Sequence, residues 1–578
     1  MNFLGYFKRL SISLLVVSVS IALPNPQLAQ SAPYLNRGKQ GMVASAHALG
    51  SEAGLTILQQ GGNAVDAAVA TTLAISVVEP FSAGIGGGGF LLLRNGKTGA
   101  IAALDFRERA PLAATRTMYL DAQGKVRPNA STDGYLAVGV PGTIAGLREV
   151  HRQYGRLSWP QVVAPAVRLA ADGFVVSPRL AAAIARQKTL QQNPAARQIF
   201  TRSGKPLDVG DRLVQADLAK TLRSVAQNPQ NFYIGSIAQA IARDMKTNGG
   251  LITLQDLKQY RPIWREPVCG TFRAARICSM PPPSSGGVHL LQMLNLIGDM
   301  DLKALGWHHP DTLHLLVETM RIAYADRAEY LGDPDFVKVP VAALISPAYA
   351  QLRRQEIDPN QARPSSQVRA TDRTVLQRFS QTKESGDTSH LSVVDRENNA
   401  VSLTFTVNLS FGAGVVTAGT GIVLNNEMDD FAIAPGVPNA FGLVGREANA
   451  IDPRKTPLSS MTPTIVTENG QLRLVTGAPG GSTIITTVLQ VVLNVLVYEM
   501  DVRSAVAAPR VHHQWLPDQL MVEQRGLDTL TLAELRRRGH KITTERGSWG
   551  NANAIVRSSD GWLEGAADPR GEGAAYGF

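Results

Sequence analysis

An alternation of apolar and polar residues marks a pair of strands in the second half of the chain. Residues 388–395 and 400–408 both have the pattern of strands, and the polar residues between them predict a turn. Side chains point alternately to the two faces of a strand, so the second run has one apolar and one polar face. The apolar face holds Val401, Leu403, Phe405 and Val407, and the polar face holds Ser402, Thr404, Thr406 and Asn408.

The length of the turn decides which side chains of the two strands face each other. A three-residue loop, 396–398, would place Thr388 opposite Thr406 and beside Asn408. A loop one residue longer would reverse the faces. We expect the shorter loop, because it gathers hydroxyl groups and an amide around Thr388.

Helical and strand patterns elsewhere predict a layered α+β domain. Residues 51–80 have the apolar spacing of two helices separated by a glycine break, and residues 143–260 are mostly helical in pattern. The other elements expected are strands at 90–94 and 101–106 and helices near 483–497 and 530–538. Helices, then strands, then more helices suit sheets that are covered by helices.

The N-terminus has the pattern of a secretory signal peptide. Lys8 and Arg9 precede an apolar run at 10–23, and small and polar residues follow. The run is shorter than the roughly 20 apolar residues that span a membrane comfortably, and a retained anchor is the alternative. We expect residues 1–30 to be a signal peptide and the protein to be exported, to the periplasm or the medium.

The charge of the chain argues against nucleic acid as a partner. The 578 residues include 57 Lys and Arg and 47 Asp and Glu, a net charge of +10, and the basic residues are scattered. Without a basic stripe interleaved with aromatics, nucleic acid is not expected as a partner.

Residues 360–387 are polar and rich in turn formers, so we expect an exposed connector at which cleavage is tolerated.

The chain has two cysteines, Cys269 and Cys278, in strand-like sequence. A two-residue turn at 273–274 would bring them opposite each other. Export permits a disulfide, and two free thiols are the alternative. Without nearby histidines the pair falls short of a zinc set, so we expect no metal site.

Two motifs that could indicate other chemistry lack the context they need. The glycines of 84–89 fit G-x-G-x-x-G, but a helix precedes them and a strand follows, the reverse of a dinucleotide fingerprint. We interpret them as a place of close backbone packing. His512 and His513 would point to opposite faces of a strand and are expected to be structural, and His289 and His390 lack metal-ligand spacing.

Glycine pairs and carboxylates form two candidate site segments. Gly480 and Gly481 precede an expected helix, where paired N–H groups can hold an anion or an oxyanion. Glu427 and Asp430 are three residues apart and share a face if that segment is helical. A plain turn and surface acids are the respective alternatives.

Two further segments offer a guanidinium and hydroxyls. Arg107 follows an apolar strand, which is a suitable place for a fork that binds a carboxylate. Ser459 and Ser460 supply two neighbouring hydroxyls, which carry no information alone.

Taken together, these segments resemble the γ-glutamyltranspeptidase family, also called γ-glutamyltransferases or glutathione hydrolases. The resemblance runs from about residue 40 to the C-terminus, with seven motifs in the family's order: LDFRERAP, SMPPPSSGGVH, DTSHLSVVD, FTVNLSFGAG, LNNEMDDF, PLSSMTPT and TGAPGGS. It implies the four-layer αββα sandwich of the N-terminal-nucleophile hydrolases. It also implies self-cleavage between Asp387 and Thr388 into a large subunit, 31–387, and a small subunit, 388–578, that remain together as a heterodimer.

The resemblance also implies a role for each candidate residue. Thr388 is the expected nucleophile, Thr406 the hydrogen-bond partner of its hydroxyl, and Gly480 and Gly481 the oxyanion hole. Arg107, Ser459 and Ser460 are expected to bind the α-carboxylate of the γ-glutamyl group. Asn408, Glu427 and Asp430 are expected to bind the α-ammonium of the same group.

Residues 439–445 resemble the family's lid loop over the pocket. Phe441 stands where some bacterial members have Tyr. Its ring can cover the site but cannot donate a gating hydrogen bond, so we expect looser closure.

The activity implied by the resemblance is cleavage of the γ-glutamyl bond of glutathione and related amides through a γ-glutamyl-threonine ester. Amino acids, peptides or water would accept the acyl group. Neither a cofactor nor a metal is expected. The alternatives are a cephalosporin or glutaryl acylase of the same fold, and an uncut, inactive binding protein of the periplasm.

Overall fold

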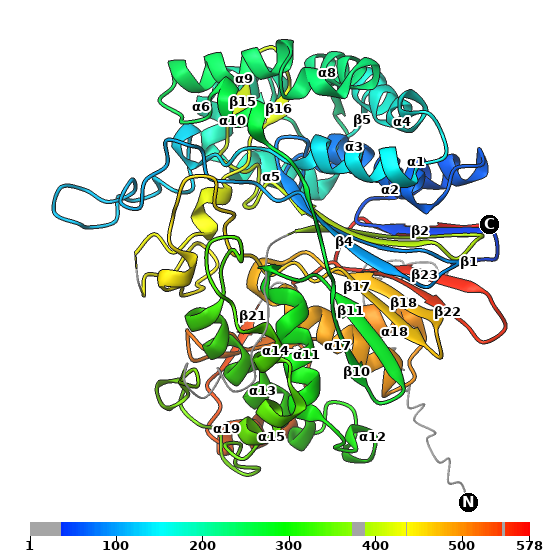
Figure 1. Cartoon of the computed structure of the whole chain (residues 1–578), viewed down its shortest axis with the longest axis vertical. Coiled ribbons are helices and arrows are strands. Elements are labelled where there is room, and N and C mark those ends of the chain that lie inside the picture. The colour runs from blue at the N-terminus through cyan, green and yellow to red at the C-terminus, as the bar shows by residue number, and fades with distance from the viewer. Residues whose placement is uncertain (1–35, 373–387, 435, 546–548) are drawn as a thin grey trace, which may run out of the picture. The chain divides into compact units, whose positions relative to one another are not determined.

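Two β-sheets lie face to face, and helices cover the outer side of each (Figure 1). This computed structural model describes residues 36–372, 388–434, 436–545 and 549–578. The predicted signal peptide and Asp387 of the predicted cleavage site lie outside these residues. The helix–sheet–sheet–helix order of the described part confirms the predicted αββα architecture.

The first sheet holds the two strands that the alternating pattern predicts, and they lie near its centre. All neighbouring strands in this sheet are antiparallel. In order across the sheet they are β24 (Ala574–Gly577), β2 (Gly41–Ser45), β13 (Ser389–Asp395), β14 (Ala400–Thr406), β3 (Gly88–Arg94), β4 (Ile101–Asp105) and β9 (Ile263–Arg265).

β13 and β14 pair in the register that a three-residue loop predicts. Ser389 lies opposite Phe405, and the pairing keeps this register along both strands. Its continuation by one residue sets Thr388 opposite Thr406. The loop length inferred from the sequence is therefore confirmed.

The two faces of β14 meet different layers of the sandwich. Leu403 and Phe405 belong to the core beneath the first helical layer. On the other face, the hydroxyl of Ser402 donates to the carbonyl of Thr476 in the second sheet at 3.0 Å. Because side chains alternate along a strand, the sequence pattern decides which face meets helices and which meets the other sheet.

The second sheet is also antiparallel throughout. Its strands, in order, are β1 (Asn36–Gly38), β23 (Leu563–Ala567), β22 (Asn553–Arg557), β18 (Gln471–Gly477), β17 (Thr464–Glu468), β11 (Ala275–Ser279) and β10 (Val268–Phe272). Apolar side chains fill the space between the two sheets, among them Met42, Phe90, Leu92, Ile465, Val475 and Ile555.

The helices over the first sheet come from the first half of the chain. Asn63 begins α2 with a capping box: its side chain accepts the backbone N–H of Asp66, and the Asp66 side chain accepts the backbone N–H of Asn63. The layer comprises α1 (Ala48–Gln59), α2 (Ala64–Val78), α3 (Thr143–Tyr154), α4 (Trp159–Asp172), α5 (Pro178–Arg186), α6 (Lys188–Gln192), α7 (Pro194–Phe200), α8 (Ala216–Gln227), α9 (Ser236–Thr247) and α10 (Leu254–Gln259). α1 and α2 confirm the predicted helix pair and its break.

The helices over the second sheet come from both predicted subunits. From the first part of the chain come α11 (Ser285–Ile297), α12 (Leu302–Leu305), α13 (Pro310–Tyr330), α14 (Val341–Leu344) and α15 (Pro347–Arg354). From the second come α17 (Ile484–Leu496), α18 (Val502–Ala507) and α19 (Thr529–Arg537). α11 and α17 pack against each other, so the two parts of the chain share one core.

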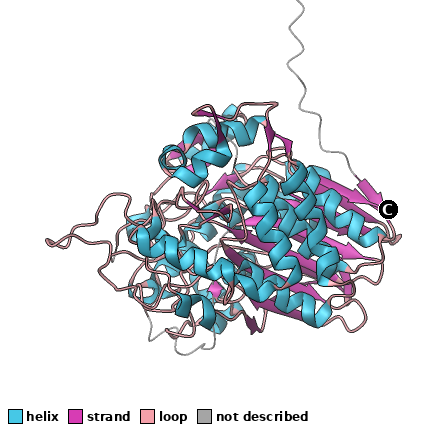
Figure 2. Ribbon diagram, turned by 90° about the horizontal axis from the view of Figure 1, so that it is seen from above, coloured by secondary structure: helices cyan, strands magenta, loops and turns pink. Residues whose placement is uncertain are grey.

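Figure 2 shows the helices lying across the sheets from above. Short strands complete the described part: β5 (Phe174–Val175), β6 (Thr201–Arg202), β7 (Lys205–Pro206), β8 (Arg212–Leu213), β12 (Pro283–Ser284), β15 (Val416–Thr417), β16 (Ile422–Val423), β19 (Val511–His512), β20 (Leu520–Glu523) and β21 (Ile542–Glu545). Within the described ranges, every helix is too short or too polar to cross a membrane.

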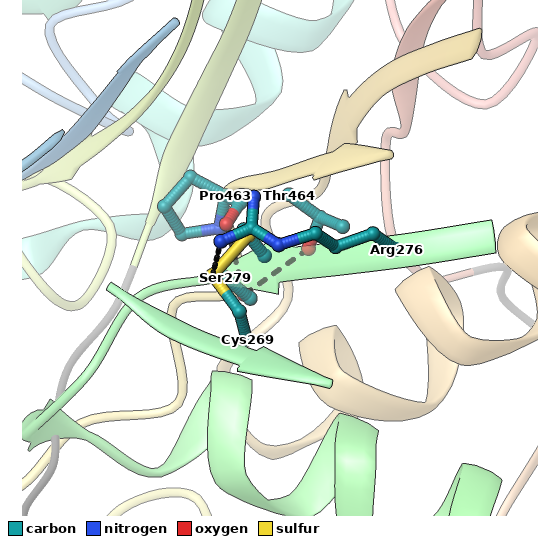
Figure 3. Close-up of a disulfide and its surroundings, with 6 residues drawn as sticks. Cys269, Arg276, Ser279, Pro463 and Thr464 are labelled. Carbon is teal, nitrogen blue, oxygen red and sulfur yellow. Dashed lines mark hydrogen bonds between the residues drawn. A yellow bond between two sulfur atoms is a disulfide. The ribbon is translucent and has the colours of Figure 1, made fainter. Parts of the chain in front are cut away.

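A disulfide joins the two strands at one edge of the second sheet. Cys269 of β10 lies opposite Cys278 of β11, the pairing expected from a two-residue turn, and their sulfur atoms are bonded (Figure 3). Arg276 Nη2 lies 3.3 Å from the Cys269 sulfur. Ser279, next to the bridge, donates its hydroxyl to the carbonyl of Pro463 at 2.9 Å and so ties the hairpin to β17.

Candidate active site

Thr388 lies at the start of β13, opposite the end of β14. Thr388 is 8% exposed, and Thr406 is buried. The hydroxyl of Thr406 accepts the backbone N–H of Asn408 at 2.6 Å, and Asn408 donates its side-chain amide to the carbonyl of Asn426 at 3.0 Å. The Asn408 side-chain oxygen is buried without a hydrogen-bond partner among the described residues. Thr406 and Asn408 are therefore hydrogen-bonded to each other at the strand end that lies opposite Thr388.

The glycine-rich segment 84–89 lets other backbone approach this strand end. Gly88 pairs with Thr406, and a Cβ on Gly87 would overlap the Thr406 carbonyl oxygen. A Cβ on Gly88 would overlap the carboxylate of Glu108. This close packing agrees with the interpretation of the glycines from the sequence.

Arg107 forms a buried fork with two carboxylates that lie more than 300 residues away in the chain. Its Nη1 lies 2.5 Å from Glu427 Oε1, and its Nη2 donates to Asp430 Oδ2 at 2.7 Å. Both acids sit on a 3₁₀ turn, η5 (Glu427–Asp430), whose three-residue repeat presents them on the same side. The family resemblance implies that these three side chains bind opposite ends of a substrate, and the structure shows them paired with one another.

A third carboxylate, that of Glu108, lies 3.8 Å from Arg107 Nη1. Burial raises the pKa of Glu108 to about 7 and that of Asp430 to about 6, although Arg107 acts in the opposite direction on both. Burial also raises the pKa of Glu427, with Glu108 and Asp430 adding to the effect. Arg107 brings one positive charge to three carboxylates with raised pKa values, so a second cation bound beside them would favour their ionised forms.

Ser459 and Ser460 lie beside β12, where Ser284 forms a β-bridge with Ser459. Arg327 of α13 donates from Nη2 to the Ser460 hydroxyl at 3.2 Å and from Nε to the Ser285 hydroxyl at 2.9 Å. Ser285 in turn donates to the Ser459 carbonyl at 2.6 Å. The Ser459 hydroxyl is buried and has no hydrogen-bond partner within the described part of the chain.

Gly480 and Gly481 form the turn between β18 and α17. Their φ angles are 134° and 56°, values that favour glycine. The backbone N–H and the hydroxyl of Thr483 both donate to the Gly480 carbonyl, at 3.1 and 2.7 Å, which fixes the turn. A Cβ on Gly481 would overlap the ring of Phe441, so that ring lies directly against the turn.

The predicted lid loop, 439–445, is tied to Asp430 through Asn439. Its side-chain oxygen accepts the N–H groups of Phe441 and Leu443, at 3.0 and 3.1 Å, and its amide donates to Asp430 Oδ1 at 3.0 Å. On the other side, Gln514 donates to the Phe441 carbonyl at 3.1 Å. Backbone contacts and Asn439 therefore hold the loop over Gly481 without any hydrogen bond from the Phe441 ring.

The histidines of the sequence analysis have structural surroundings. His390 is fully buried, contacts the hydroxyls of Thr404 and Ser392 at 2.9 and 3.0 Å, and has its pKa lowered to about 3 by burial. His512 contacts Thr486 at 2.8 Å, whereas His513 lies by Arg321 at 3.2 Å. The two neighbours point apart, as expected on a strand.

Sequence reasoning missed Glu108, Ser285 and Arg327. Glu108 directly follows Arg107, and Ser285 lies in the SMPPPSSGGVH motif, so both had a local signal. Arg327 had none, because its role depends on how α13 packs against β12.

Comparison with known proteins points to one family. The sequence model described as Gamma-glutamyltranspeptidase matches residues 50–578. The "Glutathione hydrolase proenzyme" of Escherichia coli (strain K12) is 48% identical over 92% of this chain and 91% of its own length.

Two solved structures share the fold over different extents. The cephalosporin acylase from Bacillus halodurans is 31% identical, with a TM-score of 0.83 over 98% of this chain and 99% of its own. A chain of Helicobacter pylori gamma-glutamyltranspeptidase is 46% identical, with a TM-score of 0.56 over 56% of this chain and 94% of its own. The matching Helicobacter chain thus corresponds to only part of this one.

Proposed function

Because this chain belongs to the γ-glutamyltranspeptidase family, we propose that Thr388 is its nucleophile and that glutathione is a γ-glutamyl donor. The placement of Thr388 opposite Thr406, at the end of a strand pair, is the observation that carries this proposal. The Thr388 hydroxyl attacks the γ-amide carbon, the amine of Cys-Gly leaves, and a γ-glutamyl ester remains. Water or the amino group of an acceptor then attacks the ester and restores the hydroxyl.

Self-cleavage supplies the base that this reaction needs. A threonine hydroxyl is a weak nucleophile, and a free α-amine, with a reference pKa near 8, can accept its proton. In the uncut chain that nitrogen is an amide and has no basic lone pair. Attack of Thr388 on the Asp387 carbonyl, followed by hydrolysis of the ester, would give subunits 31–387 and 388–578. The word "proenzyme" in the name of the Escherichia coli relative supports such processing.

The buried charges fit a zwitterionic acyl group. The fork of Arg107 and the hydroxyls of Ser459 and Ser460 would bind the α-carboxylate by charge-assisted and neutral hydrogen bonds. Glu427 and Asp430 would then pair with the α-ammonium, a second cation that would favour the ionised form of both acids. The Asn408 side-chain oxygen, which lacks a partner among the described residues, would accept a further ammonium hydrogen.

The turn at Gly480 and Gly481 would bind the oxyanion through its N–H groups. Since the Phe441 ring covers Gly481, lid movement would expose this turn to substrate. The same proposal includes export through the signal peptide at 1–30, so the cut enzyme would act outside the cytoplasm.

The Thr388→Ala variant tests the nucleophile. We expect it to stay a single full-length band on a denaturing gel and to release no p-nitroaniline from γ-glutamyl-p-nitroanilide. Ser389→Ala is the matched control, because it removes the adjacent buried hydroxyl and should leave cleavage intact. Mass spectrometry of the wild-type small subunit should give Thr388 as its first residue. Cleavage of Thr388→Ala at the same bond would refute the assignment.

The long match to a cephalosporin acylase favours one second candidate, an acylase that prefers glutaryl groups. A glutaryl group lacks the α-ammonium, so Glu427 and Asp430 would have to share the charge of Arg107 without a second cation. We therefore expect γ-glutamyl-p-nitroanilide to exceed glutaryl-p-nitroanilide in kcat/KM. The opposite preference would support the acylase.

A further inference from the structure

A cluster of His314, Glu318 and His540 lies away from the site described above. His314 and Glu318 are four residues apart on α13 and therefore share a face of that helix. His540 follows the end of α19, which packs against α13. All three residues are buried, and one potential ligand atom from each lies within 4.8 Å of the others.

Hydrogen bonding sets which nitrogen of His314 can act as a ligand. His314 Nε2 lies 2.7 Å from the carbonyl oxygen of Asp358, which can only accept, so this nitrogen carries the proton. His314 Nδ1 therefore has its lone pair directed at His540 Nε2, 2.8 Å away. A backbone carbonyl that fixes the outer ring nitrogen is the usual support for a metal-ligating histidine.

The carboxylate of Glu318 keeps hydrogen-bonding capacity. Its Oε1 lies 3.3 Å from Arg321 Nη1, and the backbone N–H and the charge of Arg363 also act on it. Neither of its oxygens has a side-chain hydrogen-bond partner among the described residues. Buried polar atoms are nearly always paired, so this carboxylate has room for one more partner.

Three arginines near the cluster are balanced by other acids. Arg321 also faces Asp518 at 3.7 Å, and Arg363 pairs with Glu356 at 2.9 Å. Arg538 pairs with Asp311 and Glu534, at 2.5 and 2.8 Å. Their charges weaken cation binding less than isolated arginines would.

We propose that His314, Glu318 and His540 bind one divalent transition metal ion, with zinc the best match. Two imidazoles and a carboxylate are typical zinc ligands, with a fourth position left for water. The proton on His540 Nε2 would move to Nδ1, and the two facing nitrogens would separate by about 0.5 Å to fit tetrahedral zinc. This site departs from the sequence analysis, which expected no metal.

The metal would connect the two products of self-cleavage. His314 and Glu318 belong to 31–387 and His540 to 388–578, so the ion would hold together chains that no longer share a peptide bond. A bound metal stabilises the folded form by mass action and acts here on the subunit interface.

The test uses the processed protein, purified without a histidine tag and stripped with a chelator. We expect isothermal titration with zinc chloride to give one site per heterodimer with a Kd below 1 μM, and elemental analysis after dialysis to give one zinc. Cobalt(II) should give the visible absorption of a tetrahedral site with nitrogen and oxygen ligands. Zinc at 100 times the Kd should also raise the Tm.

His540→Asn and Glu318→Gln should weaken zinc binding at least 100-fold and abolish the rise in Tm. The matched control is His309→Asn, which replaces an exposed histidine of the same helix and keeps its N-cap role. It should bind zinc as the wild type does. Wild-type protein that binds no zinc at 100 μM would overturn the proposal, and so would full binding by His540→Asn. If a variant does not fold, the wild-type titration and cobalt spectrum still decide the question.

Discussion

Replacing Asp430 with Asn separates substrate binding from chemistry at the proposed ammonium site. In the structure, Asp430 pairs with Arg107 at 2.7 Å and accepts from Asn439 at 3.0 Å. An amide has one oxygen and no charge, so it can keep only one of these partners. The change is small in volume, and we therefore expect a folded, self-cleaved enzyme.

The expected size follows from the loss of charge. Hydrogen bonds to charged groups contribute about 1.5–3 kcal/mol and neutral ones about 0.5–1.5 kcal/mol. The difference of about 1–1.5 kcal/mol corresponds to a fall of about 5- to 13-fold in kcat/KM for γ-glutamyl-p-nitroanilide. The loss should appear mainly in KM, because the ammonium is held equally in the ground and transition states.

The pH dependence gives a second readout. Burial raises the pKa of Asp430 to about 6, so the wild-type side chain becomes neutral as the pH falls below that value. The ratio of wild-type to Asp430→Asn kcat/KM should therefore be largest near pH 8 and approach one below pH 6. Titration of the Thr388 amine affects both enzymes alike and cancels in the ratio.

The control is Asp429→Asn, the same change at the neighbouring acid. Asp429 accepts from the Ser131 hydroxyl at 2.7 Å and from the Ala440 N–H at 2.9 Å, whereas the carboxylate that pairs with Arg107 is that of Asp430. We expect at most a threefold effect without the pH-dependent ratio. An Asp430→Asn enzyme within threefold of wild type at pH 8, or one that loses kcat at unchanged KM, would refute the reasoning.

Three further predictions concern stability and processing. Burial raises the pKa of Glu79 to about 7, so the folded protein loses stability as the pH rises from 4.5 to 7 and this buried side chain must ionise. Glu79→Gln should therefore raise the free energy of unfolding by roughly 3 kcal/mol at pH 8 and leave it unchanged at pH 4, measured by denaturant titration. Replacing Cys269 and Cys278 by Ser should lower that free energy by about 2–3 kcal/mol with unchanged activity, because the bridge closes a short loop at a sheet edge; equal stability with and without reductant would contradict this. Gly87→Ala should destabilise the fold by about 2–3 kcal/mol and slow self-cleavage at least tenfold on a gel time course, because its Cβ would displace the Thr406 carbonyl; normal cleavage would contradict it.

The local sequence pattern was enough to predict the strand pair and much of the helix layout. The register of β13 and β14 follows from loop length and alternation, both visible in a window of about 20 residues. The break at Gly61 and the capping box at Asn63 likewise mark the boundary of α1 and α2. Arg107 and the two acids were each recognised as candidates, but their pairing was not, because nothing local relates a turn after β4 to η5.

By itself, the sequence determined the family, the layered fold, the strand that begins after Thr388 and the faces of its partner. These depend on side-chain alternation and on motifs a few residues long. Only the tertiary structure decided that Arg107 is shared by three carboxylates, that Arg327 supports Ser460, and that His540 meets α13. Such contacts join elements from different layers, and their distances depend on how the layers pack. Burial in those layers then sets the charge states on which the proposed chemistry depends.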